Sequence, residues 1–212
     1  MIVDHENRFI IATPTKCGTT SIEALARSRG KRLGLSTVRP RQHRMVVPEE
    51  YVSFRRYMMV RNPYDRLASI YLYLSNPSNY SQWAHWEVVD KTFTQFCYWY
   101  IKQREHYGIQ SACDPGGAAS DDKWYRSPNL WLVSLGECQR VLKPHDFIRL
   151  ENLAEDLKST GRDDWGGNML HSNRSTNRKK ETRSMYSSKQ ALQRVNEAFA
   201  FVDCMQLGYE PW

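Results

Sequence analysis

The residues best suited to chemistry lie in one short segment, residues 14–21, which reads Pro-Thr-Lys-Cys-Gly-Thr-Thr-Ser. Lys16 supplies a positive charge, and Gly18 lets a ligand come close to the backbone. The segment also holds three hydroxyl side chains that can donate hydrogen bonds, those of Thr19, Thr20 and Ser21. Where such a segment leads from a strand into a helix, N–H groups and the helix dipole attract an anion. It therefore predicts a cradle for a phosphate or phosphosulfate group; a hydroxyl-capped helix without a ligand is the alternative.

A second segment with anion chemistry covers residues 61–71, which read Arg-Asn-Pro-Tyr-Asp-Arg-Leu-Ala-Ser-Ile-Tyr. Arginine makes charge-assisted, often bidentate contacts to phosphate. Ser69 stands eight residues after Arg61, on a predicted helix, and can come round to the same anion. The alternative is an ion pair between Arg61 and Asp65 that only caps the helix.

The elements that position these segments are predicted from apolar runs and capping residues. Three runs predict buried strands, namely residues 8–13, 57–60 and 147–150. The helix after the first strand is expected to start at Thr20 as N-cap, with Glu23 completing a capping box, and to end near Gly30. The helix after the second strand has Asn62 as N-cap and Pro63 in its first position.

Two further helices are predicted from apolar residues at helical spacing. One covers residues 92–106, and the last stops at Gly208. The last helix is expected to present one apolar face, formed by Leu192, Val195, Phe199 and Val202. Residues 108–128 are predicted to form a long surface loop, and residues 171–189 a basic loop. The repeated strand–loop–helix unit predicts an α/β fold, with a parallel sheet flanked by helices, in a single domain over residues 1–212.

Both anion-binding segments match one known family. Residues 14–21 resemble the 5′-phosphosulfate loop of the sulfotransferases that use 3′-phosphoadenosine 5′-phosphosulfate (PAPS), and residues 61–71 resemble their 3′-phosphate signature. Three other segments are similar to the carbohydrate (Golgi-type and bacterial) branch of this family: residues 147–157, 171–175 and 201–209. The likeness runs from about residue 8 to residue 209 and is weak between residues 72 and 145.

This resemblance implies a three-layer, P-loop-like fold and the transfer of a sulfuryl group from PAPS to an acceptor hydroxyl. Transfer would be in line, with adenosine 3′,5′-bisphosphate as product and no metal. Lys16 would be catalytic, acting on the bridging and leaving phosphate oxygens. The residues implied in PAPS binding are Lys16, Cys17, Gly18, Thr19, Thr20, Ser21, Arg61, Ser69, Arg174, Ser175, Arg178 and Lys179. The last four belong to a basic stretch that a solvated charged surface explains equally well.

A general base must take the proton of the acceptor hydroxyl, and His43 is the candidate. It lies within residues 39–44, in the interval where related carbohydrate sulfotransferases carry a catalytic histidine. Repulsion from the neighbouring arginines favours a neutral imidazole. An exposed loop histidine in a basic patch is the alternative. Other candidates for the base or for contacts to the substrates are His85, His171, Glu49 and Glu50. Trp99 is expected in the core, whereas Trp83 and Trp86 stay open.

Composition limits the class of partner. The 212 residues carry a formal net charge of +7, which favours anionic partners such as nucleotides or acidic glycans. Five scattered cysteines indicate reduced thiols. The sequence contains no signal peptide and no apolar run of membrane-spanning length, so a soluble, cytoplasmic protein is expected. The expected acceptor is a glycan or glycoside, and no nucleic acid is expected as a partner.

Three other functions compete with this interpretation. A small-molecule kinase would need a lysine directly before a serine or threonine, as in GxxxxGK[ST], but Lys16 precedes Gly18. A nucleic-acid-binding protein would explain the charge, although no familiar nucleic-acid module is visible. A PAPS-binding homologue without catalysis would keep Lys16, Arg61 and Ser69 but lack a working base.

Overall fold

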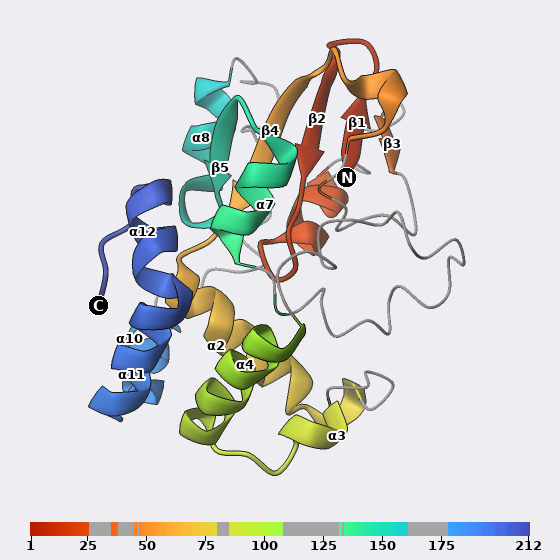
Figure 1. Cartoon of the computed structure of the whole chain (residues 1–212). Helices are drawn as coiled ribbons and strands as arrows, with labels where there is room; N and C mark the ends of the chain where they lie inside the picture. The colour runs from red at the N-terminus through yellow and green to blue at the C-terminus, as the bar shows by residue number, and fades with distance from the viewer. Residues whose placement is uncertain are drawn as a thin grey trace. The chain divides into compact units, whose positions relative to one another are not determined.

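The computed structural model describes most of the chain (Figure 1). The described residues are 1–25, 35–37, 45, 47–79, 85–107, 132, 134–160 and 178–212. Side chains are not described for residues 35–37, 79, 85–86, 106–107 and 178–181. The surface loop predicted at residues 108–128 lies outside the described part of the chain.

The chain divides into two compact units. The first unit combines Met1–Arg61 with Cys138–Arg174 and contains the sheet. The second unit combines Asn62–Glu137 with Ser175–Trp212, and its described elements are helices. The assignment of residues 1–212 to a single domain stays a prediction.

Five described strands form one sheet in the order β3-β1-β2-β4-β5. Their bounds are β1 Ile2–Asp4, β2 Phe9–Ala12, β3 Leu35–Thr37, β4 Arg55–Val60 and β5 Asp146–Arg149. Strands β2, β4 and β5 pair in parallel, whereas β1 is antiparallel to both of its neighbours. The α/β class is therefore confirmed, but the sheet is mixed and not wholly parallel as predicted.

The antiparallel strand has a local cause. Strands β1 and β2 are joined by residues 5–8 alone, and so short a connection can only return the chain alongside itself. The Asp4 carboxylate accepts hydrogen bonds from the Asn7 main-chain N–H (2.8 Å) and from the Asn7 side-chain amide (3.0 and 3.3 Å). Asp4 and Asn7 thus stabilise a turn that was not predicted from the sequence.

The three predicted strands are confirmed, with small shifts at their ends, as β2, β4 and β5. Strand β4 lies between the other two, and its last four residues, 57–60, are at most 4% exposed. Such an unbroken apolar run is typical of a parallel strand that is buried on both faces. Because parallel strands end at the same edge, the carboxyl ends of β2, β4 and β5 define one edge of the sheet.

The helices of the first unit lie before or after these strands in the sequence. They are the helix described over residues 19–25, η1 Glu49–Tyr51, α7 Leu135–Leu142, which begins in the second unit, η5 Leu150–Asn152 and α8 Leu153–Ser159. The helix after β2 begins at Thr19, and the Ile22 N–H donates to the Gly18 carbonyl oxygen (3.1 Å). Gly18, and not Thr20, therefore occupies the N-cap position, and the predicted start of this helix was too late.

The second unit is built around α2 Pro63–Leu74. Its other described elements are η2 Pro77–Asn79, α3 His85–Val88, α4 Phe93–Tyr107, α10 Arg178–Met185, α11 Lys189–Val195, the π-helical turn η6 Asn196–Ala200 and α12 Phe201–Leu207. The predicted cap of α2 is confirmed, because the Asn62 side chain accepts from the N–H groups of Tyr64 (3.0 Å) and Asp65 (3.4 Å). Helices α2, α4 and α11 share one core, in which Phe96 and Tyr100 are at most 1% exposed.

Helix α10 occupies part of the stretch that was predicted as a basic loop, residues 171–189. Arg178 and Lys179 therefore lie in the first turn of a helix, while residues 171–177 lie outside the described part. The sequence of α10 is almost free of apolar residues, so it carries no apolar periodicity that would reveal a helix.

The last helix also differs from its prediction. It ends at Gly208 as expected, with φ of 71° in the left-handed region, and it buries Val195 and Phe199. The π-helical turn η6 then shifts the register, because a π turn contains more residues than an α turn. Asp203 consequently faces the core, and Val202, which was predicted on the apolar face, is 51% exposed.

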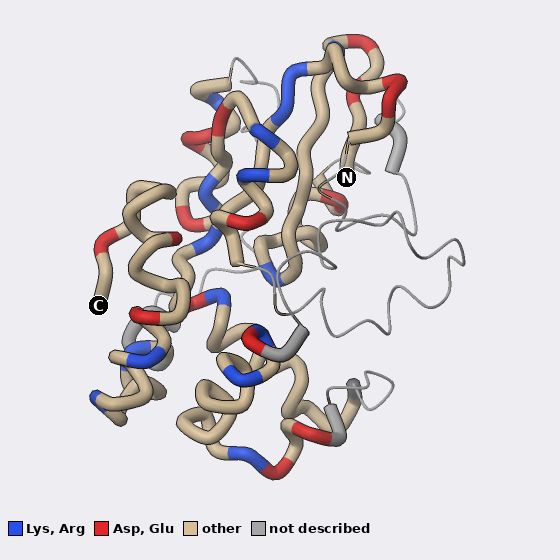
Figure 2. The backbone as a smooth tube through the Cα atoms, in the orientation of Figure 1, with Lys and Arg blue, Asp and Glu red and all other residues tan. Residues whose placement is uncertain are grey.

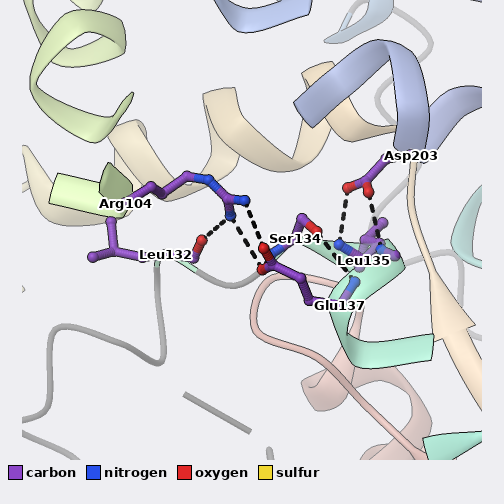
Figure 3. A network of polar contacts seen from close by, with 7 residues as sticks. Arg104, Leu132, Ser134, Leu135, Glu137 and Asp203 are labelled. Atoms are coloured by element: carbon purple, nitrogen blue, oxygen red, sulfur yellow. Dashed lines mark hydrogen bonds and ion pairs between the residues drawn. The ribbon is translucent and has the colours of Figure 1, made fainter. Parts of the chain in front are cut away.

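A buried carboxylate ties the start of α7 to α12 (Figure 3). The Asp203 carboxylate accepts from the N–H groups of Leu135 (2.8 Å) and Gly136 (2.9 Å). Ser134 and Glu137 form a capping box beside it. The Ser134 N–H donates to the Glu137 carboxylate (2.6 Å), and the Glu137 N–H donates to the Ser134 hydroxyl (3.2 Å). Two carboxylates thus satisfy the first N–H groups of α7.

Arg104 completes this network from α4. Its guanidinium forms an ion pair with Glu137 (2.9 Å), donates to the Leu132 carbonyl oxygen and lies over the Phe199 ring (5.0 Å to the centroid). Burial raises the pKa of Asp203, and the two N–H donors and nearby arginines oppose this rise. The network therefore holds a carboxylate whose ionisation is costly.

The raised pKa of Asp203 gives the first prediction. The folded protein binds this proton more tightly than the unfolded chain, so its contribution to the free energy of unfolding is largest below the unfolded pKa and falls as the pH rises through the folded value. Urea unfolding of the wild type and of Asp203→Asn should give a difference in free energy that decreases as the pH rises above about 4, the ordinary pKa of an aspartate in an unfolded chain. Asp90→Asn, at an exposed aspartate, is the control. A difference that stays constant or grows with pH for Asp203→Asn would contradict the assignment.

Candidate functional site

The candidate site lies at the carboxyl edge of β2, β4 and β5, where the first predicted anion-binding segment is located (Figure 1). Residues 13–18 follow β2, Arg61 follows β4, and Leu150 follows β5. Ligands of open α/β sheets bind outside the carboxyl ends of parallel strands. The topology therefore brings the predicted loop to the edge of the sheet where a ligand is expected.

The loop after β2 is a tight turn. The Cys17 N–H donates to the Pro14 carbonyl oxygen (3.2 Å), and Lys16 adopts φ of 63°. A left-handed lysine costs about 1–2 kcal/mol relative to its ordinary conformation. Backbone strain of this kind is concentrated at functional sites. Cys17 is fully buried, so it closes the turn from the core side while Lys16 is half-buried.

Gly18 is required for two reasons. Its φ of 87° is left-handed, and a Cβ atom at this position would lie 2.5 Å from Leu150 Cδ1 and 3.2 Å from Met59 Cε. The loop therefore packs directly on β4 and on the residue that follows β5. The glycine that was expected to permit ligand approach also permits this close packing of the loop on the sheet.

The helix that begins at Thr19 supplies the donors of the cradle. The first N–H groups of a helix have no partner within it, and they carry the positive end of its dipole. Among the described residues, the Thr19 Oγ1 atom is buried without a hydrogen-bond partner, whereas Thr20 is exposed. A buried hydroxyl of this kind fits an anion that accepts a hydrogen bond from it. The residues present thus suit a phosphate or phosphosulfate group.

Arg61 connects the two predicted segments physically. Its Nη1 atom donates to the main-chain oxygen of Lys16 (3.3 Å), and its side chain is half-buried. The contact supports the left-handed residue of the loop and places a guanidinium beside it. The sequence predicts a phosphate contact for Arg61, with an ion pair to Asp65 as the alternative, and neither includes this contact to the Lys16 main chain.

A further cation, Arg149, lies at the same edge, paired in the sheet with Val60. Its guanidinium makes two hydrogen bonds to the Asp156 carboxylate (2.8 and 3.0 Å), and its main-chain N–H makes a third (2.7 Å). Asp156 is 7% exposed and neutralises this charge. The pair explains structurally why an aspartate follows the Glu-Asn-Leu segment.

The remaining predicted ligand residues are only partly described. Ser69 lies in α2 of the second unit and is half-buried, whereas Arg61 is the last residue of the first unit's opening segment. Arg178 and Lys179 are placed in α10, without their side chains. The predicted residues that lie outside the described part are His43, Trp83, His171, Arg174 and Ser175. The backbones of His85 and Trp86 are placed in α3.

The two histidines whose side chains are described, His5 and His145, lie away from this loop. His145 directly precedes β5, and its Nδ1 accepts from the Arg56 N–H (3.0 Å) near the start of β4. His5 precedes β2 and contacts Tyr51 of η1. Both histidines therefore lie at the amino edge of the parallel strands, as does η1 with the fallback bases Glu49 and Glu50. His43 stays the candidate base as a prediction.

Trp99 is confirmed as a residue packed against the core. It lies on α4, stacks on Phe96 with ring centroids 5.7 Å apart, and donates from Nε1 to Glu87 (2.7 Å). The indole therefore connects α4 to α3 through the hydrogen bond to Glu87. Its tethered position argues against a role in stacking on a sugar ring.

Acidic and basic residues are interspersed over the described part of each unit (Figure 2). The sequence between residues 26 and 44, most of which is not described, carries seven lysines and arginines and no acid. This segment alone accounts for the formal net charge of +7. The segment that contains His43 is thus strongly basic, and residues 174–180 form a second basic stretch.

The comparisons leave the family open. No family model matches the chain, and neither a curated protein nor a solved structure matches it significantly. Within the described residues, no helix is long and apolar enough to span a membrane, and no cluster of three potential metal-ligating side chains occurs.

Replacement of Gly18 tests the cradle. Gly18→Ala should lower the free energy of unfolding by more than the penalty of a left-handed alanine, about 1–2 kcal/mol, because its Cβ would also lie 2.5 Å from Leu150 Cδ1. It should also weaken the binding of inorganic pyrophosphate. Calorimetric titration measures the binding, and thermal unfolding measures the stability.

Gly208→Ala is the matched control, because Gly208 has a similar φ of 71° and a Cβ added there would meet no atom within 4 Å. It should cost only the penalty of the left-handed φ, which is less stability than Gly18→Ala loses, and it should leave pyrophosphate binding unchanged. Equal affinities in the wild type and both variants would show that the loop does not hold the anion.

Proposed function

We propose that this protein is a PAPS-dependent sulfotransferase with a P-loop-like, three-layer architecture, and that its acceptor is a hydroxyl on a glycan or glycoside. The observation that carries the proposal is the loop after β2, left-handed at Lys16 and Gly18 and held by Arg61. The resemblance of residues 14–21 and 61–71 to the family's two cofactor motifs supports the assignment to PAPS rather than ATP.

The residues of the loop would bind the 5′ side of the donor. The first N–H groups of the helix and the Thr19 hydroxyl would contact the phosphosulfate oxygens, and Lys16 would stabilise the charge that develops on the leaving phosphate. Preorganised donors of this kind lower the barrier without reorganising during the reaction. PAPS itself supplies the activated sulfuryl group.

The acceptor side needs a base. His43 would take the proton from the acceptor hydroxyl while that oxygen forms its bond to sulfur and the bond from sulfur to the bridging oxygen breaks. The bond cleavage produces adenosine 3′,5′-bisphosphate. Until this product dissociates, its 3′-phosphate would be bound by Arg61, Ser69 and the residues of the basic stretch, Arg174, Ser175, Arg178 and Lys179. A homologue that binds PAPS without transferring the sulfuryl group would share these contacts and lack only the base that removes the proton.

The role of Arg61 gives a prediction that separates two functions of one side chain. If Arg61 binds the 3′-phosphate, Arg61→Ala should weaken adenosine 3′,5′-bisphosphate by about tenfold or more, because a charged hydrogen bond contributes about 1.5–3 kcal/mol. The same variant should affect adenosine 5′-monophosphate much less. Calorimetric titration of both nucleotides measures the contrast.

Arg55→Ala provides the control, because Arg55 is an exposed arginine at the opposite end of the same strand. It should leave both affinities unchanged. If Arg61→Ala weakens both nucleotides equally, Arg61 only supports the Lys16 turn. If the wild type itself does not prefer the nucleotide with the 3′-phosphate, the PAPS assignment fails.

The base is tested by turnover. His43→Ala should reduce sulfuryl transfer from PAPS by about 100-fold, the usual contribution of general base catalysis, and leave the affinity for adenosine 3′,5′-bisphosphate within error of the wild type. The assay follows labelled sulfate into a pool of glycans and glycosides. Unchanged turnover would assign the base to another residue. A chelator should not affect turnover. Loss of turnover in its presence would favour the kinase alternative.

A further inference from the structure

The last residue in the sequence, Trp212, packs on the first turn of α2. Its indole stacks on the Tyr64 ring, with centroids 4.6 Å apart and planes within 6° of parallel. Tyr186 contacts both rings edge-on, at 5.7 Å from Tyr64 and 5.5 Å from Trp212. The guanidinium of Arg183 lies over the indole (5.7 Å). Tyr64 thus lies between two aromatic partners and is fully buried.

Hydrogen bonds fix the same contact at the level of the backbone. The Trp212 N–H donates to the Tyr64 hydroxyl (2.9 Å), and that hydroxyl donates to Asn196 Oδ1 (2.6 Å). The Asn196 side-chain amide in turn donates to the main-chain oxygen of Trp212 (3.1 Å). Burial raises the pKa of Tyr64 to about 12, so its hydroxyl keeps the proton that it donates. We call Tyr64, Asn196 and Trp212 the aromatic clamp.

The first turn of α2, on which the aromatic clamp packs, also has hydrogen bonds to Tyr186 and Asn62. The Tyr186 hydroxyl donates to the main-chain oxygen of Tyr64 (3.0 Å), and Asn62 caps the first N–H groups of α2. The first turn of α2 therefore has fixed side-chain and main-chain partners in Tyr186 directly after α10, in the π-helical turn and in the C-terminal residue.

Ser69 is on the same rigid element. It lies five residues after Tyr64, which places it about 7.5 Å along the helix and about 140° around it. Ser69 accordingly shares its face with Asn62, Asp65 and Arg66, away from the clamped ring. Because side chains lean toward the helix N-terminus, its hydroxyl is directed to the turn that the aromatic clamp holds. A tilt of that turn would displace the Ser69 hydroxyl.

We propose that Trp212 is a positioning residue for the 3′-phosphate contact: by stacking on Tyr64 it holds the first turn of α2 in the orientation in which Ser69 binds that phosphate. The inference rests on the proposed function and extends it to a residue that no motif of the sequence indicates. Trp212 itself does not touch the nucleotide. Its effect is on how well the site distinguishes nucleotides with and without a 3′-phosphate.

The test compares two nucleotides across a small set of variants by calorimetric titration. In Trp212→Ala, the preference for adenosine 3′,5′-bisphosphate over adenosine 5′-monophosphate should fall by about tenfold. Trp212→Phe keeps a stacking ring and the main-chain hydrogen bonds, and it should restore the preference to within about twofold of the wild type. The affinity for the monophosphate should stay the same in both variants, because it reports on the loop of the first unit.

Ile70→Val is the matched control, since it removes one methylene from a fully buried residue of the same helix and leaves the aromatic clamp intact. It should lower the melting temperature without changing the nucleotide preference. Tyr64→Phe retains the stacked ring but removes the hydroxyl, and it covers the case in which Trp212→Ala does not fold. That variant should lose several-fold of the preference.

The outcomes are distinct. A preference that is unchanged in Trp212→Ala, or in Tyr64→Phe if the alanine variant does not fold, overturns the inference and leaves the proposed function intact. Loss of both affinities together also overturns it, because a merely structural role predicts that pattern. A wild type without any preference for the 3′-phosphate overturns the proposed function first, which the wild-type titration alone reveals.

Discussion

The turn after β2 must be left-handed twice within three residues, at Lys16 and at Gly18, and the candidate site depends on this constraint. Gly18 meets it at little cost, whereas Lys16 needs support. That support comes from the hydrogen bond that closes the turn at Cys17 and from the Arg61 guanidinium on the Lys16 carbonyl. The same conformation lets Leu150 lie against Gly18, so the ends of three parallel strands meet around one loop.

Features set by local chemistry could be predicted from the sequence. The Asn62-Pro63 cap of α2 and the apolar runs of β2, β4 and β5 depend on neighbouring residues alone. Strands β1 and β3 have three residues each and exist only through pairing, so no local pattern distinguishes them. The π-helical turn that exposes Val202 also has no sequence signature. By contrast, the capping box of Ser134 and Glu137 has a local pattern, S-x-x-E, that the sequence does contain.

The candidate site shows the same division. Residue types and order identified the loop, since Lys16, Gly18 and the hydroxyl residues are contiguous. The contact of Arg61 with Lys16 joins residues 45 positions apart, and it follows from strand order, which only the folded sheet fixes. The role of Arg149 could not be predicted for a different reason. It depends on whether Asp156 neutralises the charge of the guanidinium, and sequence spacing alone does not decide that.

Arg61 can support the loop and bind a ligand at the same time. A guanidinium carries five N–H donors, and one of them reaches the Lys16 carbonyl while others can contact a phosphate. One side chain would then link the loop that binds the 5′ side of the nucleotide to the 3′-phosphate. A 3′-phosphate that orients the guanidinium would also stabilise the strained Lys16 turn, and an occupied loop would orient Arg61. Under the proposed function, the two halves of the site would thus bind cooperatively through a single residue, because each ligand group stabilises the conformation that the other one requires.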